Sequence, residues 1–128
     1  MHEKERKYDA TYALDSAAGV RKLLRDHHAL AARQYLGDYD ATVILEDLRA
    51  AIGRARLTRR QRQAVYYVYV RDMTQERAAV RMDLSDKSAV SLLLARAESD
   101  IAAVYEAWAW QGEGYAIHYE EIEGDDAE

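Results

Sequence analysis

Apolar residues recur at helical spacing along most of the chain, and the clearest run follows Asp86. Its members are separated by four, three, four, three and four positions: Val90, Leu94, Ala97, Ile101, Val104 and Trp108. Such spacing places them on one side of a helix, so it predicts a long C-terminal helix with a buried stripe. The stripe suits packing against another helix, either an N-terminal helix of the same chain or one from a second subunit. Folding back within the chain is the more economical interpretation, and a homodimer stays open.

Two earlier segments show the same period. The first helix is expected from Asp15 or Ser16, one of which would be its N-cap, to about Tyr35. Its predicted apolar side consists of Val20, Leu23, Leu24, Leu30 and Ala31. After a break at Gly37-Asp38, a second helix is expected from Asp40, as N-cap, to about Ala55. Its apolar positions are Ile44, Leu45, Leu48, Ala51 and Ile52.

The middle of the chain predicts two closely spaced helices joined by a turn. Thr58 is expected to cap a helix that runs to Val70, and Thr74 and Ser85 are expected to cap the next two helices. Between the last two caps, Ala78, Ala79 and Met82 fall on one face, and Leu84 is expected to fill the turn. The pattern is typical of a helix-turn-helix unit.

Composition agrees with an all-α fold of about five helices. The 128 residues contain no proline to interrupt helices, and they form one ordinary domain. We divide the chain into a flexible N-terminus (1–14), a helical extension (15–56), the two-helix unit with the long last helix (57–110) and an acidic tail (111–128). No apolar run approaches the roughly 20 residues of a membrane span, and the N-terminus has no signal-peptide core. Cysteine is also absent, so we expect a cytoplasmic protein without a membrane partner.

Charge is distributed unevenly, although the net charge is −5. Residues 54–104 hold ten Lys/Arg against six Asp/Glu, whereas residues 105–128 hold none against eight. The basic side chains are densest between Arg54 and Arg62. A positive middle beside a negative tail indicates a polyanionic partner. Whether the tail covers the arginines and competes with that partner stays open.

Neither catalysis nor a cofactor is indicated. No nucleophile has a matched base, and no phosphate-binding loop is present. His27-His28 would point about 100° apart on a helix, and Asp38-x-Asp40 lacks the spaced ligands of a calcium loop, so we expect no metal site. The ten tyrosines could stack on unpaired bases, but core or boundary positions are the stronger interpretation.

The segment LTRRQRQAVYYVYVRDMTQERAAVRMDLSDKSAVSLLLARAESDIA, which begins at Leu57, resembles region 4 of sigma-70-type transcription initiation factors. It is more similar still to the small sigma-like regulators of phages and mobile elements. The similarity rests on Leu57-Thr58, Met73 to Glu76, Ala78-Ala79, Ser85 to Val90 and Arg96 to Glu98. It covers about a third of the chain, which lacks room for the other regions of a full sigma factor.

The resemblance implies that the helix after Ser85 enters the major groove of duplex DNA while the preceding helix crosses the backbone. The outward positions of its first turns would be Asp86, Lys87, Ser88 and Ser91, with Leu92 as a further candidate. Ser85, at the helix start, is also a candidate DNA-binding residue. Thr74 and Gln75 would face a phosphate, and Arg59, Arg60 and Arg62 would supply sequence-independent attraction. RNA polymerase is a second implied partner.

This chain departs from the family pattern in two respects. Asp83 stands where the turn glycine is usual, and Asp86 and Leu92-Leu93 stand where polar or basic residues are usual. Two functions therefore stay open. One is a sequence-specific transcription regulator, and the other is a protein-interaction module, such as a polymerase-binding adaptor, without base readout.

Overall fold

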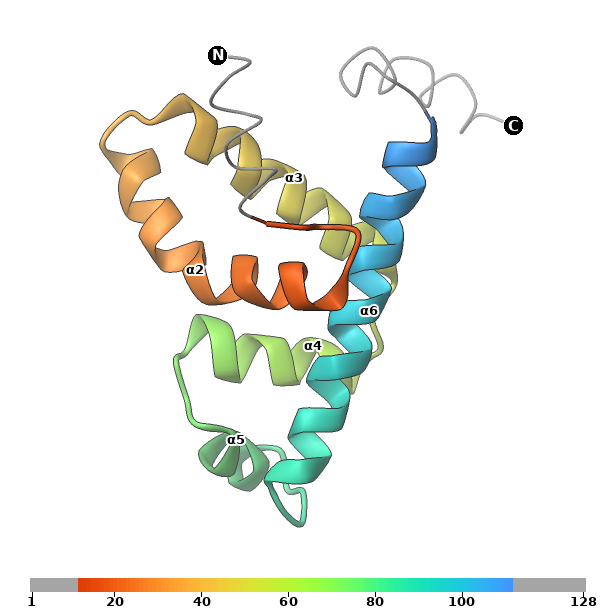
Figure 1. Ribbon diagram of the computed structural model, residues 1–128. Helices are drawn as coiled ribbons and strands as arrows, with labels where there is room; N and C mark the ends of the chain where they lie inside the picture. The colour runs from red at the N-terminus through yellow and green to blue at the C-terminus, as the bar shows by residue number, and fades with distance from the viewer. Residues whose placement is uncertain (1–11, 112–128) are drawn as a thin grey trace.

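The computed structural model describes residues 12–111, and every regular element in this range is helical (Figure 1). The elements are α2 (Ala17–Tyr35), α3 (Tyr39–Ala55), α4 (Arg59–Val65), the π-helical turn η1 (Tyr66–Val70), α5 (Gln75–Arg81) and α6 (Lys87–Gln111). The all-α prediction is confirmed. None of these helices has both the length and the apolar character needed to cross a bilayer. Gln111, the first residue of the predicted acidic tail, ends α6. The rest of that tail and most of the predicted flexible N-terminus lie outside the described residues.

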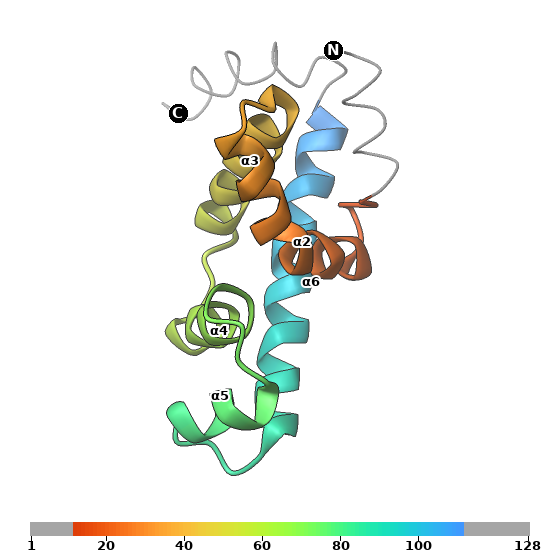
Figure 2. The same cartoon turned by 90° about the vertical axis from the view of Figure 1, so that its left-hand side faces the viewer.

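The long helix α6 is the common support of the fold. Helices α2, α3, α4 and α5 all pack against it, with α3 toward its end, α2 and α4 near its middle and α5 beside its start (Figures 1 and 2). The predicted stripe is buried except for Val104, which is half-buried. Tyr105 and Ala102 extend it. The helices that cover the stripe therefore come from the same chain.

Helices α2 and α3 form an antiparallel pair, and three residues determine where these helices begin and end. The Ser16 hydroxyl accepts a hydrogen bond from the Gly19 amide, which confirms Ser16 as the N-cap of α2. Gly37 has a φ of 94°, a backbone conformation that favours glycine, and it ends the helix as predicted. The cap of α3 is Asp38, so the prediction of Asp40 is wrong. Asp40 lies in the first turn and is buried.

Most predicted core positions in this pair are correct. Four of the five expected in α2 are buried, but Ala31 is exposed because it lies past the point where α2 packs on α6. In α3, Leu45, Leu48 and Ala51 are buried, and Ile44 and Ile52 are half-buried.

The segment before α2 packs onto the core instead of extending from it. Tyr12 is buried, and its hydroxyl donates to Asp26 over 2.9 Å. A side chain at Gly19 would collide with the carbonyl oxygen of Ala13, so this glycine permits the close approach. The last residues assigned to a flexible N-terminus are thus part of the packed domain.

The helix expected from Thr58 to Val70 changes character halfway. Thr58 caps it in a capping box, because its hydroxyl accepts from the Gln61 amide while the Gln61 side chain accepts from the Thr58 amide. From Tyr66 the turn widens, and the Arg71 amide donates to the carbonyl of Tyr66 over 2.9 Å. A π-helical turn shifts the side chains that follow it relative to a regular helix.

One buried carboxylate connects three of these elements. Glu98, on α6, is 2% exposed. It accepts from Arg21 Nε of α2 at 3.0 Å and from the Tyr69 hydroxyl of η1 at 2.9 Å. A buried charge is tolerated when it is paired and hydrogen-bonded, so Glu98 fixes how α2 and η1 sit on α6. Burial raises the pKa of Tyr69 well above its usual range, and the Glu98 carboxylate raises it further.

Replacing Tyr69 with Phe should destabilise the fold by about 1–3 kcal/mol, because Glu98 loses a donor where water cannot replace it. The matched control is Tyr66→Phe, at an exposed tyrosine of the same turn, which should change the free energy of unfolding by less than about 0.5 kcal/mol. Urea unfolding followed by circular dichroism measures both. Equal effects would contradict a structural role for the Tyr69 hydroxyl.

Stability should also fall in alkaline solution in a way that depends on Tyr69. The folded state keeps the Tyr69 proton, whereas an unfolded tyrosine releases it near its ordinary pKa of about 10. The contribution is therefore complete below about pH 10 and is lost as the pH rises above that value. Urea unfolding between about pH 9 and about pH 11 should show a shallower loss in Tyr69→Phe than in Tyr66→Phe. Identical slopes would refute this assignment.

Candidate nucleic-acid interface

Helices α5 and α6 are joined by a tight turn at one end of the molecule. The Thr74 hydroxyl accepts from the Arg77 amide, which confirms Thr74 as the cap of α5. In the turn, Asp83 has a φ of 58°, and the Leu84 amide donates to the carbonyl of Ala79 over 2.8 Å. Asp83 thus adopts the left-handed conformation that favours glycine and that aspartate tolerates better than most other residues. Leu84 is half-buried against the core.

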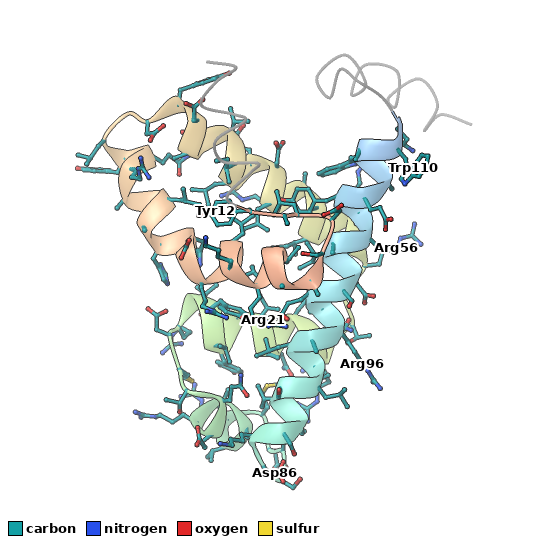
Figure 3. All side chains as sticks on the ribbon, viewed as in Figure 1. Tyr12, Arg21, Arg56, Asp86, Arg96 and Trp110 are labelled. Carbon is teal, nitrogen blue, oxygen red and sulfur yellow. The ribbon has the colours of Figure 1, made fainter. Side chains whose placement is uncertain are left out.

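The cap of α6 is Asp86 and not Ser85, so that prediction is wrong. One Asp86 carboxylate oxygen accepts from the amides of Ser88 (3.0 Å) and Ala89 (3.4 Å), and from the Ser88 hydroxyl. The hydrogen bond from the Ser88 side chain, followed by those from the two amides, lowers the pKa of Asp86. Figure 3 shows Asp86 at the tip of the molecule, where α6 begins. Two predicted base contacts, Asp86 and Ser88, therefore also hold the helix start together.

Lys87 and Ser91 complete the exposed first turns of α6. The Lys87 ammonium lies 3.8 Å from a Glu76 carboxylate oxygen of α5, and both side chains are more than half exposed. An exposed ion pair of this length is weak, so Lys87 remains available to a nucleic acid. Ser85 and Thr74 are exposed and Gln75 is half-buried near the same end. The structure thus brings together seven of the ten predicted residues.

The remaining three, Arg59, Arg60 and Arg62, lie elsewhere. They are exposed on α4, whose first turn meets the middle of α6 through a 3.4 Å hydrogen bond from Gln61 to Asp100. At 1.5 Å per residue, Asp100 lies about 20 Å along α6 from Lys87. The three arginines therefore lie apart from the seven residues that gather at the start of α6.

Sequence reasoning missed two arginines on α5. Arg77 and Arg81 are exposed and one turn apart, whereas Ala78 and Ala79 between them are buried. The Arg81 guanidinium lies 5.6 Å from the ring centre of Tyr67, which helps to orient it. The spacing of four between these arginines was the available signal. In a helix that crosses a DNA backbone, these arginines would face phosphates.

Acidic and basic side chains are equal in number where α5 meets the start of α6. Glu76, Asp83 and Asp86 stand against Arg77, Arg81 and Lys87. This end of the molecule therefore provides no net positive charge, and the densest group of basic residues is the set of arginines on α4.

The described residues contain no candidate metal site. Within residues 12–111, no three His, Cys, Asp or Glu side chains are placed to hold a metal ion. His28 instead lies 3.4 Å from Asp72, and the His27 ring contacts the carbonyl of Leu24.

Comparisons with protein-family models, curated proteins and solved structures returned no match.

Substitutions at Asp86 should separate its capping role from its charge. Asparagine caps a helix as well as aspartate does, so Asp86→Asn should keep the thermal midpoint near that of the wild type. Asp86→Ala should lower the midpoint, and Ser85→Ala, the control, should leave it unchanged. Differential scanning calorimetry distinguishes these outcomes. A lower midpoint for Ser85→Ala than for Asp86→Ala would show that the cap is misassigned.

Proposed function

We propose that this chain is a sequence-specific duplex-DNA-binding transcription regulator that resembles sigma factor region 4. The observation that best supports this proposal is the structure at the start of α6. Lys87 and Ser91 are exposed there, and a short turn connects this helix to α5. A helix start of this kind offers its first turns to base edges in the major groove. Lys87 can donate to guanine, and the serine hydroxyls can donate or accept.

The supporting helix and the arginines suit phosphate contacts. Arg77 and Arg81 project from α5, while Arg59, Arg60 and Arg62 project from α4 farther along the molecule. Contacts to phosphates position a protein on DNA without reading its sequence. RNA polymerase is the second partner that we propose, by the same resemblance.

An alternative is a polymerase-binding adaptor without base readout. It is favoured by two apolar side chains near the start of α6. Val80 is 78% exposed and Leu92 is 51% exposed, and the surrounding charges balance. Exposed apolar residues among balanced charges suit a protein partner better than a polyanion.

Selection from a randomised duplex DNA pool, at low and near-physiological salt, tests the first function. We expect a recovered motif, and we expect Lys87→Ala to weaken binding to that motif by about tenfold while leaving binding to random duplex nearly unchanged. Arg62→Ala should weaken binding to both by similar factors and reduce the salt dependence. Lys22→Ala, on α2, is the control that should change neither.

Absence of any motif would reject the proposed base readout. Binding of purified RNA polymerase that is retained by Lys87→Ala but lost in Val80→Glu would then establish the adaptor function.

A further inference from the structure

One long side of α6 faces away from every other helix. Leu92 and Trp110 lie on it, five helical turns and about 27 Å apart. They are 51% and 83% exposed. Figure 3 shows Arg96 and Trp110 projecting from α6 on the side opposite to α2 and α4. We call the side of α6 between Leu92 and Trp110 the outer face.

The residues between these two ends allow another helix to approach closely. Ala95, Ser99, Ala103 and Ala107 are all exposed on the outer face and carry short side chains. A groove of about 470 Å³ between α3 and α6 adjoins the face and includes Ala103 and Ala107 in its wall. Short side chains reduce the distance between packed helices.

Four pairs of positions on the outer face match about its midpoint along α6, which is level with Ile101 on the buried side of the helix. Leu92 and Trp110 are equally far from this centre, as are Arg96 and Glu106. The short residues match in the same way, Ala95 with Ala107 and Ser99 with Ala103. A surface with this symmetry is complementary to a second copy of itself about a two-fold axis.

We propose that the outer face of α6 binds the outer face of a second copy of this chain, with the two helices antiparallel. Leu92 then meets Trp110 of the other copy, and Arg96 lies level with its Glu106. Neither charged residue forms an ion pair within residues 12–111. A parallel pair would place Arg96 against Arg96 and Glu106 against Glu106, so charge selects the antiparallel arrangement.

This pairing leaves the start of α6 outside the contact. Residues 87–91 precede Leu92, and those of the two copies lie at opposite ends of the pair, about 36 Å apart along the helices. The dimer does not depend on the proposed DNA binding, and either property can fail without the other. A single pair of helices is a small interface, so we expect dimerisation to depend on concentration over the micromolar range.

Sedimentation equilibrium of the full chain at increasing concentration tests the pairing. Arg96→Glu and Glu106→Arg should each raise the dimer dissociation constant by about tenfold, and the double variant should restore it, because the opposite charges meet again. Circular dichroism verifies that each variant keeps its helices. A monomer throughout the range, or a dimer unaffected by the single reversals, would overturn the proposal.

Disulfide formation tests the register, since the natural chain has no cysteine. A mixture of Ser99→Cys and Ala103→Cys proteins should form a mixed disulfide dimer under mild oxidation. The control mixture of Ser91→Cys and Ala103→Cys should not, because Ser91 lies outside the paired positions. Equal yields in the two mixtures would overturn the antiparallel register.

Discussion

The buried carboxylate of Glu98 sets the arrangement of the helices. A carboxylate removed from water is costly unless donors replace its hydration, and here the donors come from two separate parts of the chain. Arg21 belongs to the N-terminal helical pair and Tyr69 to the turn before α5. Both side chains must reach the same carboxylate on α6. Glu98 therefore fixes the positions of α2 and η1 relative to each other along that helix. The apolar contacts around Glu98 supply the attraction, and the carboxylate supplies the alignment.

The π-helical turn at Tyr66–Val70 makes this alignment possible. It places the Tyr69 hydroxyl 2.9 Å from Glu98, while the ring of Tyr67 lies beside the Arg81 guanidinium. Tyr69 is therefore buried in the core, and Tyr67 is half-buried where η1 meets α5. These two tyrosines therefore have structural positions, which agrees with the interpretation favoured over base stacking.

Three parts of the surface of α6 have different structural or proposed functional roles. Its start supports the proposed nucleic-acid contacts, its inner side holds the core, and its outer face supports the proposed pairing. The start is governed by local hydrogen bonds, since Asp86 and Ser88 stabilise the first turn by their own side chains. The outer face depends only on residues that the rest of the fold leaves uncovered. The two proposed functions can therefore be altered separately.

The sequence by itself determined the elements whose causes are local. Helical periodicity located the buried stripe of α6, Gly37 marked the end of α2, and Ser16, Thr58 and Thr74 were recognisable as caps. Each of these depends on residues within a few positions of one another. The two misplaced caps show the limit of such reasoning, because Asp38 and Asp86 each stood within two positions of another plausible residue.

Only the tertiary structure decided what depends on distant residues. Glu98 lies close to the apolar stripe in the helical pattern, but its burial became evident only with Arg21 and Tyr69 beside it. The separation of the arginines of α4 from Lys87 likewise follows from where α4 crosses α6. Periodicity shows which side of a helix is buried, but the partner and the crossing point depend on how side chains from distant segments fit together.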